Sequence, residues 1–133
     1  MLILVTGGSG SGKSEYAENL AVSFGLKPLL YIATMLPYGE ENKKKIKRHQ
    51  VMREEKKFNT LECYTDILSV SLNNRPVVLL ECMSNLLANE MFQENGAKEL
   101  SVEKITAGLE HLIQQSEHVI IVSNEVFSDG MPY

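Results

Sequence analysis

A glycine-rich loop lies between a short apolar run and a segment of helical spacing near the amino end of the chain. The run covers residues 2–6, reads LILVT, and is continuous rather than alternating, which is typical of a parallel strand covered on both faces. From Lys13 to about Phe24, small or apolar residues recur at helical spacing, and Gly25 follows as a stop signal. Strand, loop and helix in this order predict the first unit of an α/β fold.

The loop matches the phosphate-binding pattern G-x-x-x-x-G-K-[ST] at each required position. Its glycines let successive backbone N–H groups turn toward a phosphate chain, and the helix N-terminus adds a partial positive charge. The pattern places Lys13 at the β- and γ-phosphates and the Ser14 hydroxyl on Mg²⁺, and a Gly/Ser-rich turn without a ligand is the alternative. We predict that a nucleoside triphosphate binds Gly7, Gly8, Ser9, Gly10, Ser11, Gly12, Lys13 and Ser14.

The remaining sequence alternates between predicted strands and predicted helices. Strands are expected at 29–33, 58–64, 75–81 and 119–123, and helices at 41–57, 65–72, 84–92 and 101–115. This alternation predicts a P-loop NTPase-like α/β fold, with a mostly parallel sheet flanked by helices and right-handed crossovers. The 133 residues, 44% of them apolar, are expected to form a single nucleotide-binding domain.

Composition excludes several broad classes of protein. A net charge of −4 argues against a general nucleic-acid binder, although eight of the 13 Lys and Arg residues lie between positions 43 and 57. Cys63 and Cys82 have apolar neighbours and no metal-ligand spacing, so we expect reduced, buried thiols. No apolar run is long enough to span a membrane, and the first run is too short for a signal peptide. The expected location is the cytoplasm.

A P-loop enzyme also needs an acidic residue at the end of a neighbouring strand, to hold the magnesium ion directly or through water. Glu81 follows the apolar residues 77–80 and is the obvious candidate. The predicted metal ligands are therefore Ser14 and Glu81. The alternative is that Glu81 caps the next helix near Ser84.

A cationic stripe is predicted on the helix at 41–57. Lys45, His49 and Arg53 fall at i, i+4 and i+8, where like charges weaken an isolated helix unless solvent or an anion such as a triphosphate lies against them. The neighbouring cations disfavour the imidazolium, and a neutral imidazole can attack an α-phosphorus to give a phosphoramidate. Alternatively, His49 borders a buried helix face with Ile46 and Met52, and the lysines are solvated surface.

Six sequence blocks in one order resemble the family of bifunctional adenosylcobinamide kinases / adenosylcobinamide-phosphate guanylyltransferases of cobalamin biosynthesis. The blocks are ILVTGGSGSGKS, LYIAT, IKRHQVMR, TLEC, VVLLECMSNLLAN and VIIVSNEV, and they span nearly the whole chain. The resemblance implies a P-loop α/β fold, a homotrimer, and phosphorylation of adenosylcobinamide with ATP or GTP. It further implies transfer of GMP from GTP, through a guanylylated histidine, to adenosylcobinamide phosphate, which yields adenosylcobinamide-GDP.

The resemblance also assigns roles to individual residues. His49 matches the guanylylated histidine, in the I-x-x-H-x-x-x-R setting that ends at Arg53, and Lys13 would stabilise the charge on the transferred phosphoryl group. Asn124 matches a turn of the family at a strand end. Beyond the P-loop, the implied nucleotide contacts are Ala33, Thr34, Met35, Gln50, Val51, Met52, Arg53, Glu62 and Glu81.

The chain departs from the family pattern at a few points. Gly10 stands where the family usually has Arg, which leaves one fewer cation for the phosphates, and Phe58 is expected in place of a usual Trp. The family continues through another helix and a last strand, which this domain is expected to lack. Two other functions are compatible with the motifs: a P-loop small-molecule kinase in which His49 only contacts phosphates, and a nucleotide-binding module without catalysis.

Overall fold

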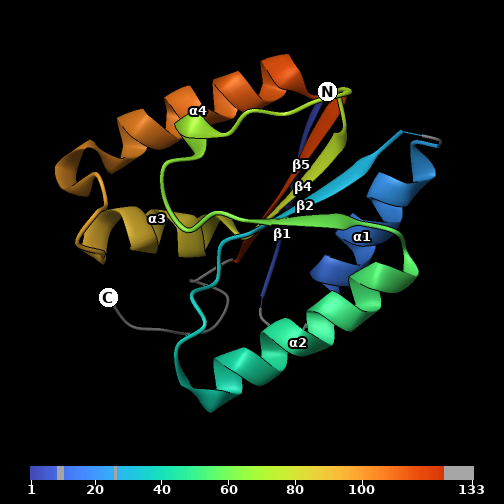
Figure 1. Ribbon diagram of the computed structural model, residues 1–133, viewed down its shortest axis with the longest axis horizontal. Helices are drawn as coiled ribbons and strands as arrows, with labels where there is room; N and C mark the ends of the chain where they lie inside the picture. Colours follow the sequence, from blue (N-terminus) through green and yellow to red (C-terminus); the bar gives the residue numbers. More distant parts are fainter. Residues whose placement is uncertain (9–10, 26, 125–133) are drawn as a thin grey trace.

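The computed structural model describes residues 1–8, 11–25 and 27–124, and within them five strands form one parallel sheet (Figure 1). The strands are β1 (Leu2–Gly7), β2 (Leu29–Ala33), β3 (Asn59–Glu62), β4 (Val77–Glu81) and β5 (His118–Asn124). Their order across the sheet is β1-β5-β4-β2-β3, and each neighbouring pair is parallel. The predicted α/β class with a mostly parallel sheet is confirmed.

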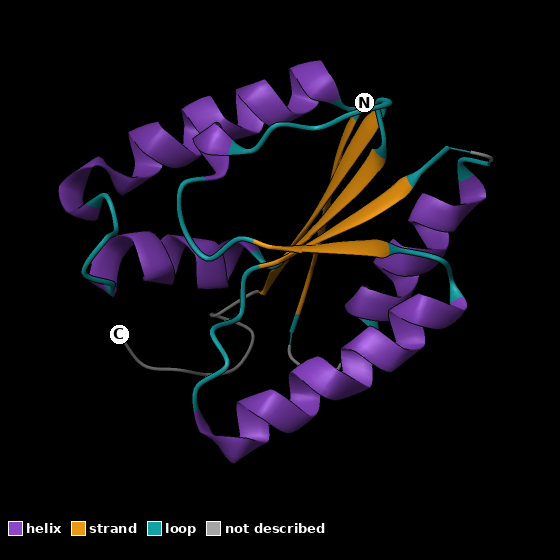
Figure 2. Ribbon diagram, viewed as in Figure 1, coloured by secondary structure: helices purple, strands orange, loops and turns teal. Residues whose placement is uncertain are grey.

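Helices cover both faces of this sheet (Figure 2). They are α1 (Lys13–Ser23), α2 (Gly39–Glu55), α3 (Met83–Phe92) and α4 (Ser101–Gln115), with short 3₁₀ helices η1 (Ile67–Ser69) and η2 (Lys98–Leu100). Helices α1 and α2 lie on one face, and α3 and α4 lie on the other. No helix in the described ranges has the length and apolar character needed to cross a membrane.

Strand β4 is the centre of the core because both of its faces are covered. Val77 and Leu79 pack in the cluster that contains Ala17 of α1, whereas Val78 and Leu80 pack in the cluster that contains Leu86 of α3. These four side chains of β4 have no exposed surface. A strand buried on both faces needs apolar residues at every position, which explains the unbroken apolar run in the sequence.

The helix predicted at 65–72 is wrong. Only η1 forms there, and Asp66 precedes it with a φ of 60°, a left-handed conformation that an α-helix does not contain. The carboxylate of the buried Glu90 on α3 accepts hydrogen bonds from the backbone N–H of Asp66 at 2.9 Å and of Ala97 at 3.0 Å. The contact with Glu90 therefore determines the backbone conformation at Asp66, and local helix propensity does not.

Gly108 of α4 lies against η1 without room for a larger side chain. A Cβ at this position would lie 2.4 Å from Cγ1 of Ile67 and 3.0 Å from the backbone nitrogen of Leu68. We expect Gly108→Ala to lower the free energy of unfolding by about 1–3 kcal/mol, measured by urea denaturation. Helix propensity alone would raise the free energy of unfolding by about 1 kcal/mol in Gly108→Ala. The sign of the measured change therefore shows whether the steric clash with η1 or helix propensity dominates.

A matched control for this variant lies on the exposed face of the same helix. Thr106→Ala is expected to change the free energy of unfolding by less than about 0.5–1 kcal/mol, since it removes only an exposed hydroxyl that donates to the Val102 carbonyl. A Gly108→Ala protein more stable than the wild type would contradict the close packing between α4 and η1.

Candidate active site

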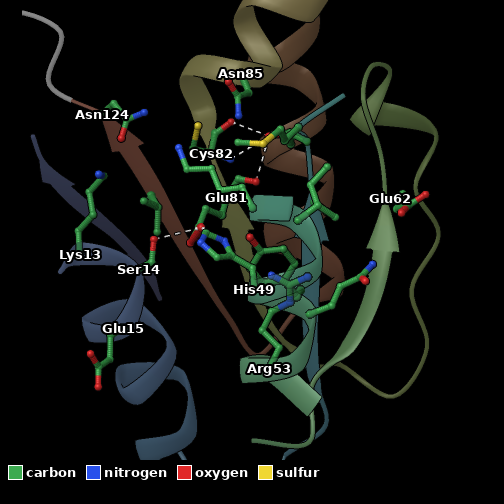
Figure 3. A pocket seen from close by; sticks show the side chains of 18 of the residues that line it. Lys13, Ser14, Glu15, His49, Arg53, Glu62, Glu81, Cys82, Asn85 and Asn124 are labelled. Carbon is green, nitrogen blue, oxygen red and sulfur yellow. Dashed lines mark hydrogen bonds and ion pairs between the residues drawn. The ribbon is translucent and has the colours of Figure 1, made fainter. Parts of the chain in front are cut away.

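The carboxyl ends of the parallel strands meet at one edge of the sheet, where ligands of open α/β folds bind. A cavity of about 470 Å³ lies at this edge, between the strand ends, the first turn of α1 and the inner face of α2 (Figure 3). The cavity brings together residues that the sequence analysis took from separate segments. Those that line it are Gly12, Lys13, Ser14, Ala33, Thr34, Met35, His49, Gln50, Arg53, Glu62, Glu81 and Asn124.

The phosphate loop turns sharply into α1. Gly12 adopts a φ of 83°, a left-handed conformation that a glycine takes without steric strain, directly before the first helical residue. The backbone N–H of Ser11 donates to the carbonyl of Gly8 at 3.2 Å, and the ammonium group of Lys13 donates to the same carbonyl at 3.1 Å. Gly7 and Gly8 belong to this loop but do not line the cavity. Ser9 and Gly10 lie outside the described residues.

Ser14 and Glu81 meet at the end of the cavity where α1 begins. The Ser14 hydroxyl donates to Oε2 of Glu81 at 3.1 Å, while Oε1 of Glu81 is buried and has no hydrogen-bond partner in the described part of the chain. A hydroxyl and an unpartnered carboxylate oxygen are the hard ligands that Mg²⁺ prefers. These two residues therefore fit a magnesium ion. The alternative, a capping role for Glu81, does not occur, because no side chain caps α3.

The magnesium ion would need further ligands from outside the protein. Within residues 1–8, 11–25 and 27–124, no group of three His, Cys, Asp or Glu side chains is arranged to hold a metal. Mg²⁺ usually keeps several waters and binds through one or two protein groups together with substrate phosphates. The pair of Ser14 and Glu81 matches that mode of binding, with the phosphate loop beside it.

His49 projects from α2 into the cavity and faces the same carboxylate. Its Nδ1 lies 3.6 Å from Oε2 of Glu81, and 29% of its side chain is exposed. The imidazole thus faces the cavity, and the cationic stripe of Lys45, His49 and Arg53 follows the cavity wall. The sequence analysis considered only the cations around His49. The structure adds the carboxylate of Glu81 to the surroundings of the imidazole.

Arg53 is the most buried cation of the stripe. It is 2% exposed, and its guanidinium carbon lies 3.5 Å from the centroid of the Tyr31 ring. Its Nε is buried without a hydrogen-bond partner, and Arg53 forms no ion pair with an acid among the described residues. Burial, and then the negative charge of Glu81, raise the pKa of the Tyr31 hydroxyl above its ordinary range. A guanidinium held on an aromatic face in this way is suited to bind an anion.

Buried hydrogen bonds fix the strand ends that form the cavity floor. Thr34 is fully buried, and its hydroxyl oxygen accepts the backbone N–H of Cys82 at 2.8 Å. The amide of Asn89 donates to the carbonyl of Thr34 at 2.8 Å and to that of Tyr64 at 3.0 Å. These contacts connect the ends of β2 and β4 to the segment after β3. Thr34 therefore stabilises the floor of the cavity.

The sequence matches, over residues 3–133, the family described as cobinamide kinase / cobinamide phosphate guanyltransferase. The chain belongs to this family. It is 33% identical over 140 residues to the bifunctional adenosylcobalamin biosynthesis protein CobU of Escherichia coli strain K12, an alignment that covers 95% of this chain and 76% of that protein. The protein of the same name from Salmonella typhimurium strain LT2 is 36% identical over 100 residues, which cover 72% of this chain and 53% of that protein.

Membership of the cobinamide kinase / cobinamide phosphate guanyltransferase family confirms the resemblance that the six sequence blocks indicated. Not every implied nucleotide contact lies at the cavity. Val51 is 52% exposed and does not line it, and the side chain of Met52 lies outside the described part of the structure. The alternation of side chains along β2 places Tyr31 on the same face as Ala33, a signal that the sequence analysis missed. The other lining residues it did not assign to the site are Glu15, Ile46, Tyr64, Cys82, Asn85 and Val122.

Proposed function

We propose that the chain catalyses both reactions named in its family. One is phosphorylation of adenosylcobinamide with ATP or GTP, and the other is transfer of GMP from GTP to adenosylcobinamide phosphate, which yields adenosylcobinamide-GDP. The observation that carries the proposal is the position of one carboxylate oxygen. Oε2 of Glu81 lies 3.1 Å from the P-loop hydroxyl of Ser14 and 3.6 Å from Nδ1 of His49. A phosphate-binding loop and a nucleophile thus share one cavity.

In the guanylyl transfer, the triphosphate of GTP lies along the phosphate loop and Lys13. Because Glu81 faces Nδ1 of His49, Nε2 is the nitrogen left to attack the α-phosphorus. A P–N bond forms as the bond from the α-phosphorus to the bridging oxygen breaks, and pyrophosphate leaves with the electron pair. Lys13 and the loop N–H groups stabilise the negative charge on this leaving group.

The second half of the transfer regenerates the histidine. A phosphate oxygen of adenosylcobinamide phosphate attacks the guanylyl phosphorus, the P–N bond breaks, and its electron pair returns to the imidazole. The covalent intermediate divides one difficult transfer into two easier steps. When bound through Ser14 and Glu81, Mg²⁺ would neutralise phosphate charge and polarise the phosphoryl oxygens.

In the kinase reaction, the same loop holds ATP or GTP with its γ-phosphoryl group toward the substrate hydroxyl. The substrate oxygen bonds to the γ-phosphorus as the bond from this phosphorus to the β,γ-bridging oxygen breaks. ADP or GDP leaves with the electron pair of that bond, and the proton of the substrate hydroxyl passes to water. Lys13 stabilises the charge that spreads over the transferred group. Both reactions thus place the charge that develops on phosphate within reach of Lys13, which lies at the same end of the cavity as Ser14.

Labelled GTP tests the proposal. With Mg²⁺ and GTP labelled at the α-phosphate, we expect label bound to the protein that survives base, is lost in acid and maps to the peptide containing His49. Adenosylcobinamide phosphate should release this label as adenosylcobinamide-GDP. If no label binds but the γ-phosphate of ATP reaches adenosylcobinamide, the chain is a kinase alone. If GTP binds without either reaction, the chain is a nucleotide-binding module.

The proposed partners follow from these reactions. They are GTP, ATP, adenosylcobinamide and its phosphate, with no nucleic acid, and we place the protein in the cytoplasm as a homotrimer. The trimer is what the resemblance in sequence implies, and light scattering coupled to size-exclusion chromatography measures it directly. A mass of one chain in solution would contradict it.

A further inference from the structure

Helix α2 carries His49 but has little apolar attachment to the rest of the fold. Among the side chains of α2 that the structure describes, only that of Arg53 is buried. None of the described residues of α2 belongs to the two hydrophobic clusters that cover the faces of the sheet. Helices of globular proteins normally gain most of their stability from an apolar face packed on the core. The position of α2, and with it the position of His49, therefore depends on polar contacts.

Charged side chains supply these contacts along one face of the helix. His49 faces Glu81 of β4, and Arg53 lies on the ring of Tyr31 of β2. A third contact is made by Lys56, the residue that ends the helix. Positions 49, 53 and 56 are spaced at i, i+4 and i+7, so their side chains leave the same face of α2. Lys56 does not line the cavity, so this face of the helix extends beyond the cavity toward α1.

Lys56 pairs with a buried carboxylate of α1. Its ammonium group donates to Oε1 of Glu18 at 3.1 Å, and 25% of the Lys56 side chain but only 3% of the Glu18 side chain is exposed. Of the four ion pairs that the described residues form, this one has the shortest N–O distance and the most buried acid. A carboxylate buried in this way is costly to leave unpaired. The pair therefore constrains how α2 lies beside α1 (Figure 1).

The ion pair and the reacting groups are carried by the same two helices. Glu18 follows Ser14 on α1 by four residues, which is about one turn, or about 6 Å along the axis. Lys56 follows His49 by seven residues, which is about two turns, or about 10 Å. Ser14 and His49 meet at Glu81, whereas Glu18 and Lys56 contact each other directly. Helices α1 and α2 are thus connected at two levels, and the reacting groups lie at only one of them.

We propose that the ion pair between Lys56 and Glu18 fixes α2 on α1 and so positions His49 for attack on the α-phosphorus. This inference rests on the function proposed above and adds two positioning residues to it. Neither of the two lines the cavity, so both act through α2 and touch no substrate. The contact of His49 with Glu81, at 3.6 Å, is longer than a hydrogen bond and fixes the imidazole only weakly. Misplacement of a reacting group by about 1 Å can lower a rate by about 100-fold.

The test removes the ion pair and follows the two reactions separately. At saturating GTP, Lys56→Met should lower the first-order rate of His49 labelling by about 10- to 100-fold and change the KM for GTP by less than about threefold. Phosphorylation of adenosylcobinamide should stay within about threefold of wild type, because Lys13, Ser14 and Glu81 are not carried by α2. A variant that is only less stable would lose both reactions in proportion. Equal rates of labelling in Lys56→Met and the wild type would overturn the proposal.

Two further variants separate loss of the ion pair from loss of stability. Lys56→Arg keeps a cation within reach of Glu18 and should be labelled within about threefold of the wild-type rate. The double variant Glu18→Leu with Lys56→Met leaves no buried carboxylate without a partner, so it should fold but be labelled as slowly as Lys56→Met. A double variant that is labelled at the wild-type rate would show that the ion pair does not position His49.

The matched control changes the next residue of the chain. Lys57 is exposed and forms no ion pair with a described residue, so Lys57→Met removes the same charge without removing the contact between α1 and α2. Both reactions should keep their wild-type rates in this variant. Slow labelling in Lys57→Met as well would show that the cationic charge of this segment matters and that the pair with Glu18 does not.

Amide hydrogen exchange separates failure of this inference from failure of the proposed function. The measurement requires no nucleotide, and the amides of residues 45–56 should exchange about tenfold faster in Lys56→Met than in the wild type or in Lys57→Met. If exchange responds in this way but the wild type takes up no label, the proposed transfer fails and the attachment of α2 by the ion pair stands. If the wild type is labelled but neither exchange nor labelling depends on Lys56, the transfer stands and the ion pair has no positioning role.

Discussion

His49→Ala is expected to lower GMP transfer from GTP by at least about 10⁴-fold and to remove the acid-labile label on the protein altogether. The reason is chemical, because alanine offers no nitrogen to attack the α-phosphorus, and the covalent route requires one. The other two histidines cannot replace it. His111 is held at the carbonyl of Leu68, and His118 begins β5, at the opposite edge of the sheet from the cavity, where it stacks on Phe24.

The kinase reaction provides the internal comparison for this variant. Phosphorylation of adenosylcobinamide by ATP labelled at the γ-phosphate should persist in His49→Ala, because Lys13, Ser14 and Glu81 remain. The neighbouring Arg48 is exposed and does not line the cavity, so Arg48→Ala is a matched control on the same helix, and both reactions should stay within about threefold of wild type. An acid-labile label that persists in His49→Ala would place the nucleophile elsewhere.

The sequence was sufficient to predict most of the sheet because four of its strands contain continuous apolar runs, whereas the edge strand β3 reads NTLE and is largely exposed. Residues 77–80 read as a strand covered on both faces, and β4 has that environment. The phosphate loop was predictable for a related reason. Its glycines and its Lys-Ser pair are consecutive, so no tertiary contact was needed to place them between β1 and α1.

Features that depend on contacts between distant segments were not predictable in this way. The backbone at Asp66 is held by Glu90, which lies 24 residues later on α3, and no local pattern reports that contact. The same holds for the cavity. Glu81 and His49 entered the sequence analysis as separate hypotheses, and only the packing of α2 over the end of β4 brings them within 3.6 Å.

Glu81→Gln is expected to lower both the kinase reaction and the guanylyl transfer, each by about 10²- to 10³-fold. The amide keeps the shape of the side chain, but it removes the negative charge that faces Nδ1 of His49 and the carboxylate that would hold Mg²⁺ with Ser14. Glu81→Gln thus lowers the rates of both reactions, whereas His49→Ala lowers only the rate of guanylyl transfer. Rates of both reactions, measured over a range of Mg²⁺ concentrations, test this expectation.

Two further variants separate the roles of Glu81. Ser14→Ala removes the hydroxyl ligand but leaves the contact between Glu81 and His49, so it should raise the Mg²⁺ concentration that both reactions require without altering the site of labelling. Glu110→Gln makes the same charge change on the exposed face of α4, across the sheet from α2, and should leave both rates unchanged.

In EDTA, Glu81→Gln should bind GTP at least as tightly as the wild type does, because the substitution removes a negative charge near the bound phosphates. A variant that loses only one of the two reactions would show that Glu81 does not link the phosphate loop to His49.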